Sequence, residues 1–113
     1  MSTVLNPKFQ IYKSGSEFRY RLKARNGEII LSGEGYTSKQ GCLNGISSVK
    51  ENSPLDSRYD RKIAVNGQFY FTLKAANGEI IGVSETYTTQ SSRENGIDAV
   101  KKVAPSAPIE DLT

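Results

Sequence analysis

One segment of the chain occurs twice. Residues Phe18–Lys50 recur as Phe69–Lys101 without a gap, so the Asn26–Gly27 pair returns as Asn77–Gly78. A period of about 50 residues is typical of a duplicated supersecondary unit that buries its apolar face only against a neighbouring unit. The duplication predicts one domain over residues 1–113, with repeat one at about 8–57 and repeat two at about 58–113.

Strict alternation of side chains predicts a half-buried strand over Glu17–Arg25. The Asn–Gly pair that follows favours a two-residue hairpin turn of the primed type, in which both central residues have positive φ. Such a turn sets the register of the returning strand. It places these residues on the core face: Phe18, Tyr20, Leu22, Ala24, Ile29 and Leu31, with Phe69, Phe71, Leu73, Ala75 and Ile80 in repeat two. It places Ile30, Ile81 and Val83 on the opposite face, and Arg19 opposite Glu34.

The apolar period then changes from that of a strand to that of a helix. Ser38 and Thr89 are expected N-caps, and Pro54 and Pro105 are expected to end the two helices. Cys42, Ile46 and Val49 form the apolar stripe of the first helix, and Ile97, Val100 and Ala104 form that of the second.

Gly45 and Gly96 lie inside the predicted helices, each preceded by Asn and followed by Ile. A glycine in an exposed helix costs about 1 kcal/mol relative to alanine. The favoured interpretation is close approach of another part of the protein to the helix backbone, and the alternative is a cleft lined by backbone. The candidate structural residues are therefore these two glycines and the turn residues Asn26, Gly27, Asn77 and Gly78.

Three motifs occur in the same order in both copies: LKA-x-NGE-I-I, E-x-Y-T and NGI-x-x-VK. This series resembles the YegP-like family of small bacterial proteins. The resemblance implies an α+β fold in which two tandem β3-α-β repeats share one antiparallel sheet. Both helices would lie on one face, the repeats would be related by an approximate two-fold, and the last strand of each repeat would be exchanged. Arg58–Ala64 and Ile109–Leu112 would be the exchanged strands.

The resemblance brings no established activity, ligand or catalytic residue. One departure from the repeat is that Arg93 stands where the first copy has Cys42. Arg93 is expected either to be exposed or to extend its charged end from an apolar stem to solvent.

The residues that most enzymes use are scarce. The chain has no histidine, so it lacks a neutral-pH imidazole base, and Cys42 is its only cysteine. No segment has the spacing of a calcium loop, a phosphate-binding loop or a dinucleotide-binding loop. Glu34 and Glu85, each two residues before a tyrosine, form either an acid/base pair or ordinary cross-strand ion pairs, and the second interpretation is favoured. The sequence therefore predicts no enzyme, no metal site and no cofactor.

The net charge is +3 and the isoelectric point is about 9.0. Arg19, Arg21, Lys23 and Arg25 form a row about 20 Å long on the solvent face of the predicted strand, a candidate anion-binding face. Binders of single-stranded nucleic acid add exposed aromatic rings to such a row, whereas the aromatic residues of this strand point the other way. The main hypothesis is a non-catalytic structural or protein-interaction module, monomeric with an internal pseudo-dimer. The alternative is weak binding of an anionic ligand or nucleic acid by the basic row.

The single cysteine excludes an internal disulfide, the N-terminal residues lack a signal-peptide pattern, and no apolar run is long enough to span a membrane. The expected location is the cytoplasm, without a membrane partner.

Overall fold

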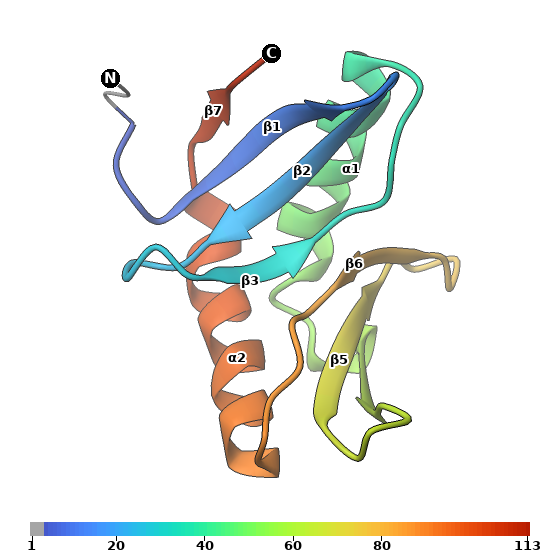
Figure 1. Ribbon diagram of the computed structural model, residues 1–113, viewed down its shortest axis with the longest axis vertical. Helices are drawn as coiled ribbons and strands as arrows, with labels where there is room; N and C mark the ends of the chain where they lie inside the picture. The colour runs from blue at the N-terminus through green and yellow to red at the C-terminus, as the bar shows by residue number, and fades with distance from the viewer. Residues whose placement is uncertain (1–3) are drawn as a thin grey trace.

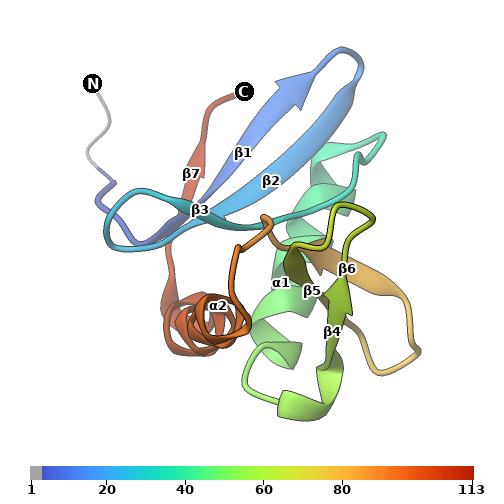
Figure 2. The ribbon, with the colours of Figure 1, turned by 60° about the horizontal axis from the view of Figure 1, so that its bottom comes forward.

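The computed structural model describes residues 4–113, which form one seven-stranded sheet and two helices. In chain order the elements are β1 (Lys8–Ser14), β2 (Glu17–Lys23), β3 (Ile29–Ser32), α1 (Lys39–Asn52), η1 (Asp56–Arg58), β4 (Tyr59–Ile63), β5 (Phe69–Lys74), β6 (Ile80–Val83), α2 (Gln90–Val103), η2 (Ala104–Ser106) and β7 (Ile109–Asp111). The strand order across the sheet is β4-β5-β6-β3-β2-β1-β7 (Figure 1). The two helices lie side by side against one face of the sheet (Figure 2). We call the other face, against which no helix of residues 4–113 lies, the open face, although Lys8 and Gln10 are buried on it.

The final strand adds a parallel edge to an otherwise antiparallel sheet. β7 pairs parallel with β1, and Phe9 N–H donates to the Pro108 carbonyl at 2.8 Å. The expectation of a purely antiparallel sheet is therefore wrong at this edge. Glu110 of β7 is buried there, because its carboxylate accepts a hydrogen bond from the Gln10 amide at 2.6 Å and pairs with Lys8 Nζ at 3.0 Å.

The Asn–Gly turns differ from the predicted primed type. Gly27 has a φ of 83°, whereas no residue other than glycine has positive φ in the described part of the chain, so Asn26 lacks the positive φ that a primed turn requires. Ala24 N–H donates to the Glu28 carbonyl and Gly27 N–H donates to the Ala24 carbonyl, both at 2.9 Å, which defines a three-residue loop. The Asn26 side chain accepts a hydrogen bond from Glu28 N–H at 3.0 Å, so only the glycine needs a left-handed conformation.

This longer loop changes which residues of β3 and β6 are buried. Leu22 pairs with Leu31 as predicted, but Lys23 pairs with Ile29, which leaves Ile30 as an extra residue in a bulge. Ile30 is only 6% exposed and lines a pocket with Gly96 and Ala99 of α2, so it lies on the helix face and its predicted position on the opposite face is wrong. The same bulge in repeat two buries Ile81 at 8% exposure and leaves Ile80 40% exposed, which reverses both predictions.

The core lies between the sheet and the two helices. Both predicted N-caps are confirmed, since the Ser38 and Thr89 hydroxyls each accept a backbone hydrogen bond three residues ahead at 3.0 Å. Cys42 is fully buried on the predicted stripe of α1. Arg93 is 5% exposed, because its guanidinium lies over the Phe69 ring and pairs with Glu94 at 3.1 Å.

The two halves of the sheet meet along a narrow seam between β3 and β6. Ser32 and Val83 form the only Cα pair recorded between these strands. The Leu31 side chain occupies the space beside Gly82, where a Cβ atom would lie 2.7 Å from a leucine methyl carbon. The Tyr20 hydroxyl crosses the seam to donate a hydrogen bond to the Ile81 carbonyl. Each half therefore completes the packing of the other.

Candidate functional site

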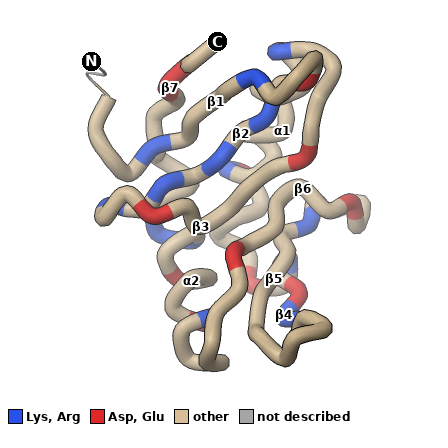
Figure 3. The backbone as a smooth tube through the Cα atoms, viewed as in Figure 1, with Lys and Arg blue, Asp and Glu red and all other residues tan. Residues whose placement is uncertain are grey.

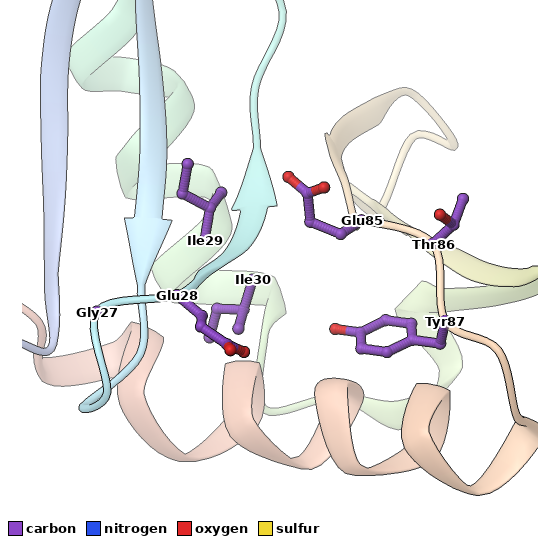
Figure 4. Close-up of a pocket in the computed structure, with 7 residues that line it drawn as sticks. All are labelled: Gly27, Glu28, Ile29, Ile30, Glu85, Thr86 and Tyr87. Carbon is purple, nitrogen blue, oxygen red and sulfur yellow. The ribbon is translucent and has the colours of Figure 1, made fainter.

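An open pocket of about 500 Å³ lies where the two repeats meet. One wall is the turn between β2 and β3, and the opposite wall is the linker from β6 to α2 (Figure 4). The lining residues are Gly27, Glu28, Ile29, Ile30, Glu85, Thr86 and Tyr87. We call this site the first corner. Its two walls carry the repeated motifs, NGE from repeat one and E-x-Y-T from repeat two.

The first corner combines apolar walls with two carboxylates. In Figure 4, Tyr87 and Glu85 project from the linker toward the hairpin, with the tyrosine hydroxyl pointing toward Ile30 and Glu28. Burial raises the pKa of the Tyr87 phenol, and the charges of Glu85 and Glu28 raise it further. Both glutamates are therefore close enough to influence the tyrosine electrostatically, although they come from different repeats.

The repeat places Glu34 and Glu79 in the positions equivalent to Glu85 and Glu28, and we call these two glutamates with Tyr36 the second corner. Burial is the largest cause that raises the pKa of Tyr36, followed by the effects of Cys42, Glu34 and Glu79. Glu34 precedes Tyr36 in repeat one, whereas Glu79 belongs to the NGE motif of repeat two. Each corner tyrosine therefore lies near one glutamate from its own repeat and one from the other repeat.

The four corner glutamates make no ion pair within residues 4–113, although the chain carries 15 lysines and arginines. Of the other eight acidic residues, Glu51 and Asp98 likewise make no ion pair within residues 4–113, and six are paired with basic side chains: Glu17, Asp56, Asp60, Glu94, Glu110 and Asp111. The corner carboxylates are thus both clustered and uncompensated.

The predicted ion pair between Arg19 and Glu34 is absent from this described region. Arg19 instead pairs with Glu17 at 3.4 Å. The reason is that β3 ends at Ser32 and the chain next rejoins β2 through a bridge between Phe18 and Tyr36. Glu34 lies in the irregular stretch between these two points, outside the regular ladder.

The helix glycines allow the corner tyrosines to lie against the helices. A Cβ atom at Gly45 would lie 2.3 Å from the Tyr36 hydroxyl oxygen, and one at Gly96 would lie 2.4 Å from that of Tyr87. Gly96 also lines a smaller pocket of about 230 Å³, together with Asn95, Asn26, Glu28 and Tyr87 among others. In repeat two, Asn77 and Gly78 form the turn equivalent to Asn26 and Gly27, and Gly78 has a φ of 88°.

The predicted basic row is divided by the end of β2. Arg19, Arg21 and Lys23 lie in the strand, whereas Arg25 belongs to the turn and lines a pocket with Ala99 and Lys102 of α2. Figure 3 shows basic residues along β1 and β2. The guanidinium carbon of Arg21 lies 4.6 Å from the centre of the Tyr12 ring, and its Nε donates to the Gln10 amide oxygen at 2.7 Å.

Tyr12 is the residue of this face that the sequence reasoning missed. It lies on β1 directly opposite Arg19, so it shares the open face with the basic side chains. The signal was present in the alternation of Lys8–Lys13, which places Lys8, Gln10 and Tyr12 on one face.

Other kinds of site find no support among the described residues. Within residues 4–113 there is no group of three or more histidine, cysteine or acidic side chains suited to a metal ion. No helix in that range is long and apolar enough to cross a membrane. Burial raises the pKa of the Cys42 thiol, which favours the unreactive protonated form.

Two stretches of the chain, residues 14–60 and 64–111, match the family described as Domain of unknown function (DUF1508). The chain belongs to this family. It is 53% identical over 106 residues to the UPF0339 protein YegP of Escherichia coli O157:H7, covering 93% of this chain and 96% of that protein. It is 49% identical over 105 residues to the UPF0339 protein in the ptx operon 5' region of Stutzerimonas stutzeri, covering 92% and 95%. These names assign no activity.

Solved structures of relatives have the same fold. The solution NMR structure of yegP from E. coli, titled a protein of unknown function, superposes with a TM-score of 0.90 at 49% identity and covers 99% of this chain and 97% of that one. The solution NMR structure of a UPF0339 protein from Shewanella oneidensis superposes with a TM-score of 0.88 at 46% identity, covering 94% and 91%. The mixed α+β fold with two repeats is therefore that of the family.

Proposed function

We propose that the protein is a non-catalytic protein-interaction module that contacts its partner through the two corners. One observation carries the proposal: glutamates and tyrosines present in both repeats meet across the repeat boundary, with their carboxylates unpaired. Packing explains the tyrosines, which lie against helix glycines, but it does not explain why exposed glutamates of both repeats gather beside each tyrosine. A partner that supplies the missing positive charge accounts for them.

We also infer how the repeats are arranged, because each corner requires both of them. Ser32 and Val83 occupy equivalent positions and pair with each other, which supports an approximate two-fold axis between β3 and β6. The pairing of β7, from the end of repeat two, with β1 of repeat one supports an exchanged strand. The arrangement is that of an internal pseudo-dimer in one domain. A free, buried cysteine suits the reducing conditions of the cytoplasm.

Capture from cell lysate with immobilised protein tests the interaction. The variant Glu34→Gln/Glu85→Gln removes one charge from each corner and disrupts no ion pair of the described chain. The control Glu51→Gln/Asp98→Asn removes two equally exposed and unpaired charges outside the corners. We expect the control to retain the proteins captured by the wild type and the corner variant to lose them. Identical capture by all three would refute the proposal.

A second candidate function is weak binding of a polyanion by the open face of β1 and β2. The observation that favours it is the position of Arg21, held between Gln10 and the ring of Tyr12, while its terminal nitrogens make no hydrogen bond within residues 4–113. Lys23 is next to it on the same strand face, and it too has no recorded ion pair. Because Arg19 pairs with Glu17 and Arg25 lies in the turn after β2, only part of the predicted row is available to an anion.

A further inference from the structure

We infer that each corner binds the side chain of an arginine from a partner protein. This inference rests on the proposed function and names its ligand chemistry. The first corner is large enough for one extended side chain, and its walls match the two chemically different parts of arginine. Ile29, Ile30 and the ring of Tyr87 provide apolar contact surface, whereas Glu28 and Glu85 provide negative charge.

The charge of the site selects the class of ligand. An anion would meet two carboxylates that have no neutralising partner, so its binding would be opposed electrostatically. A purely apolar ligand would remove water from those carboxylates without replacing the lost hydrogen bonds. A side chain with an apolar stem and a cationic end avoids both costs, because the stem covers the isoleucines while the charged end reaches the glutamates.

The geometry favours guanidinium over ammonium. The two glutamates come from opposite walls of the pocket, and the tyrosine hydroxyl points into the space near them (Figure 4). A guanidinium group presents five donors in a planar fork and stacks on aromatic rings, so it can hydrogen-bond a carboxylate of one wall while it contacts the ring of Tyr87. An ammonium group is a compact, strongly hydrated charge that satisfies fewer of these contacts at once.

The second corner repeats the same residue types around Tyr36, with Glu34 and Glu79. By this repetition the inference extends to a second arginine site, which differs from the first in having Gly35 where the first corner has Thr86. This provides an internal control that few proteins have, because one site can be removed while the other continues to report binding in the same sample.

The test is an NMR titration of the ¹⁵N-labelled full chain with three capped pentapeptides. Their sequence is Gly-Ser-Xaa-Ser-Gly, where Xaa is arginine, lysine or citrulline, the neutral analogue of arginine with the same shape. Agmatine serves as a free small-molecule guanidinium. We expect the arginine peptide to shift the amide resonances of both corners, with the citrulline peptide at least ~10-fold weaker because its hydrogen bonds are no longer charge-assisted. The lysine peptide should bind less tightly than the arginine peptide.

The variant Glu28→Gln/Glu85→Gln should abolish the shifts at Tyr87 while those at Tyr36 persist. The control Glu51→Gln/Asp98→Asn should titrate as the wild type does. If agmatine shifts the amide resonances of both corners, guanidinium recognition is supported. If the arginine peptide binds more tightly than agmatine, the ligand is an arginine within a protein segment and not a free small molecule. Equal binding of the arginine and citrulline peptides, or shifts confined to other surfaces, would overturn the inference. If capture from lysate still depended on Glu34 and Glu85 in that case, the proposed function would stand and only the ligand would be wrong.

Discussion

Replacing the helix glycines by alanine measures how tightly the corner tyrosines pack. Alanine gains about 1 kcal/mol over glycine in a helix. Against this gain, a Cβ atom at Gly96 would lie 2.4 Å from the Tyr87 hydroxyl oxygen and 3.2 Å from Cε1 of Phe71, a fully buried ring. Overpacking of this kind costs about 1–3 kcal/mol. The expected net effect of Gly96→Ala is therefore a loss of about 1 kcal/mol, or about 4 °C in Tm.

Gly45 provides the comparison within the same molecule. There the three nearest obstacles all belong to Tyr36, which is only half-buried and can rotate away. The cost and the gain should nearly cancel, so Gly45→Ala should change stability by less than Gly96→Ala. Urea unfolding monitored by circular dichroism measures both changes.

A double-mutant cycle identifies the cause. Tyr87→Leu removes both the hydroxyl and the ring carbon nearest to the new methyl group. In that background Gly96→Ala should cost less than in the wild type, since residues in contact show non-additive effects. If Gly96→Ala stabilises the wild-type protein by about 1 kcal/mol, the glycine faces free space and the packing argument is wrong.

Three further predictions concern the sheet. Deletion of residues 108–113 removes β7 and the buried ion pair between Glu110 and Lys8, so the melting temperature should fall clearly; an unchanged melting curve would show that β7 contributes nothing. Hydrogen bonds from Gln10 and Lys8 lower the pKa of Glu110 below its usual 4.5. The ionised Glu110 carboxylate therefore contributes its full stabilisation above pH 4.5, and this contribution is lost as the pH falls through the lower pKa of the folded state. In Glu110→Gln, the free energy of unfolding measured in urea should therefore decrease less as the pH falls below 4.5 than it does in the wild type. An equal decrease in both proteins would show that Glu110 does not cause it. The variant Arg19→Glu/Arg21→Glu/Lys23→Glu should keep its fold by circular dichroism and lose any salt-sensitive binding to heparin or single-stranded DNA, and wild-type binding that resists physiological salt would favour the polyanion function over the corners.

The elements of this fold were predictable because both repeats carry the same local signals. Ser38 and Thr89 cap helices at equivalent places, and the alternation of Phe18 to Lys23 gives a strand in which Tyr20 and Leu22 are fully buried. The predictions of buried residues in β3 and β6 were wrong because one additional loop residue changes the pairing register of these strands. The Asn–Gly pair suits both a two-residue and a three-residue loop. The protein has the three-residue loop, in which Glu28 N–H donates to the Asn26 side chain.

The corners were only partly predictable. The sequence shows that Glu34 and Glu85 recur before tyrosines, and that Glu28 and Glu79 recur after Asn–Gly pairs. It does not show that the glutamate of one repeat approaches the tyrosine of the other, because that depends on how the halves associate. Tyr12 was missed for a related reason, since its place beside Arg21 follows from pairing between strands and not from the pattern of one strand.

The seam between β3 and β6 makes the two repeats complementary rather than interchangeable. Leu31 and Gly82 occupy equivalent positions, and the leucine of one half fills the space that the glycine of the other leaves free. Two copies of repeat one, joined across this seam, would force leucine against leucine, whereas two copies of repeat two would leave a hole between facing glycines. In the pseudo-dimer proposed above, the large Leu31 of one half and the small Gly82 of the other therefore determine which halves can associate.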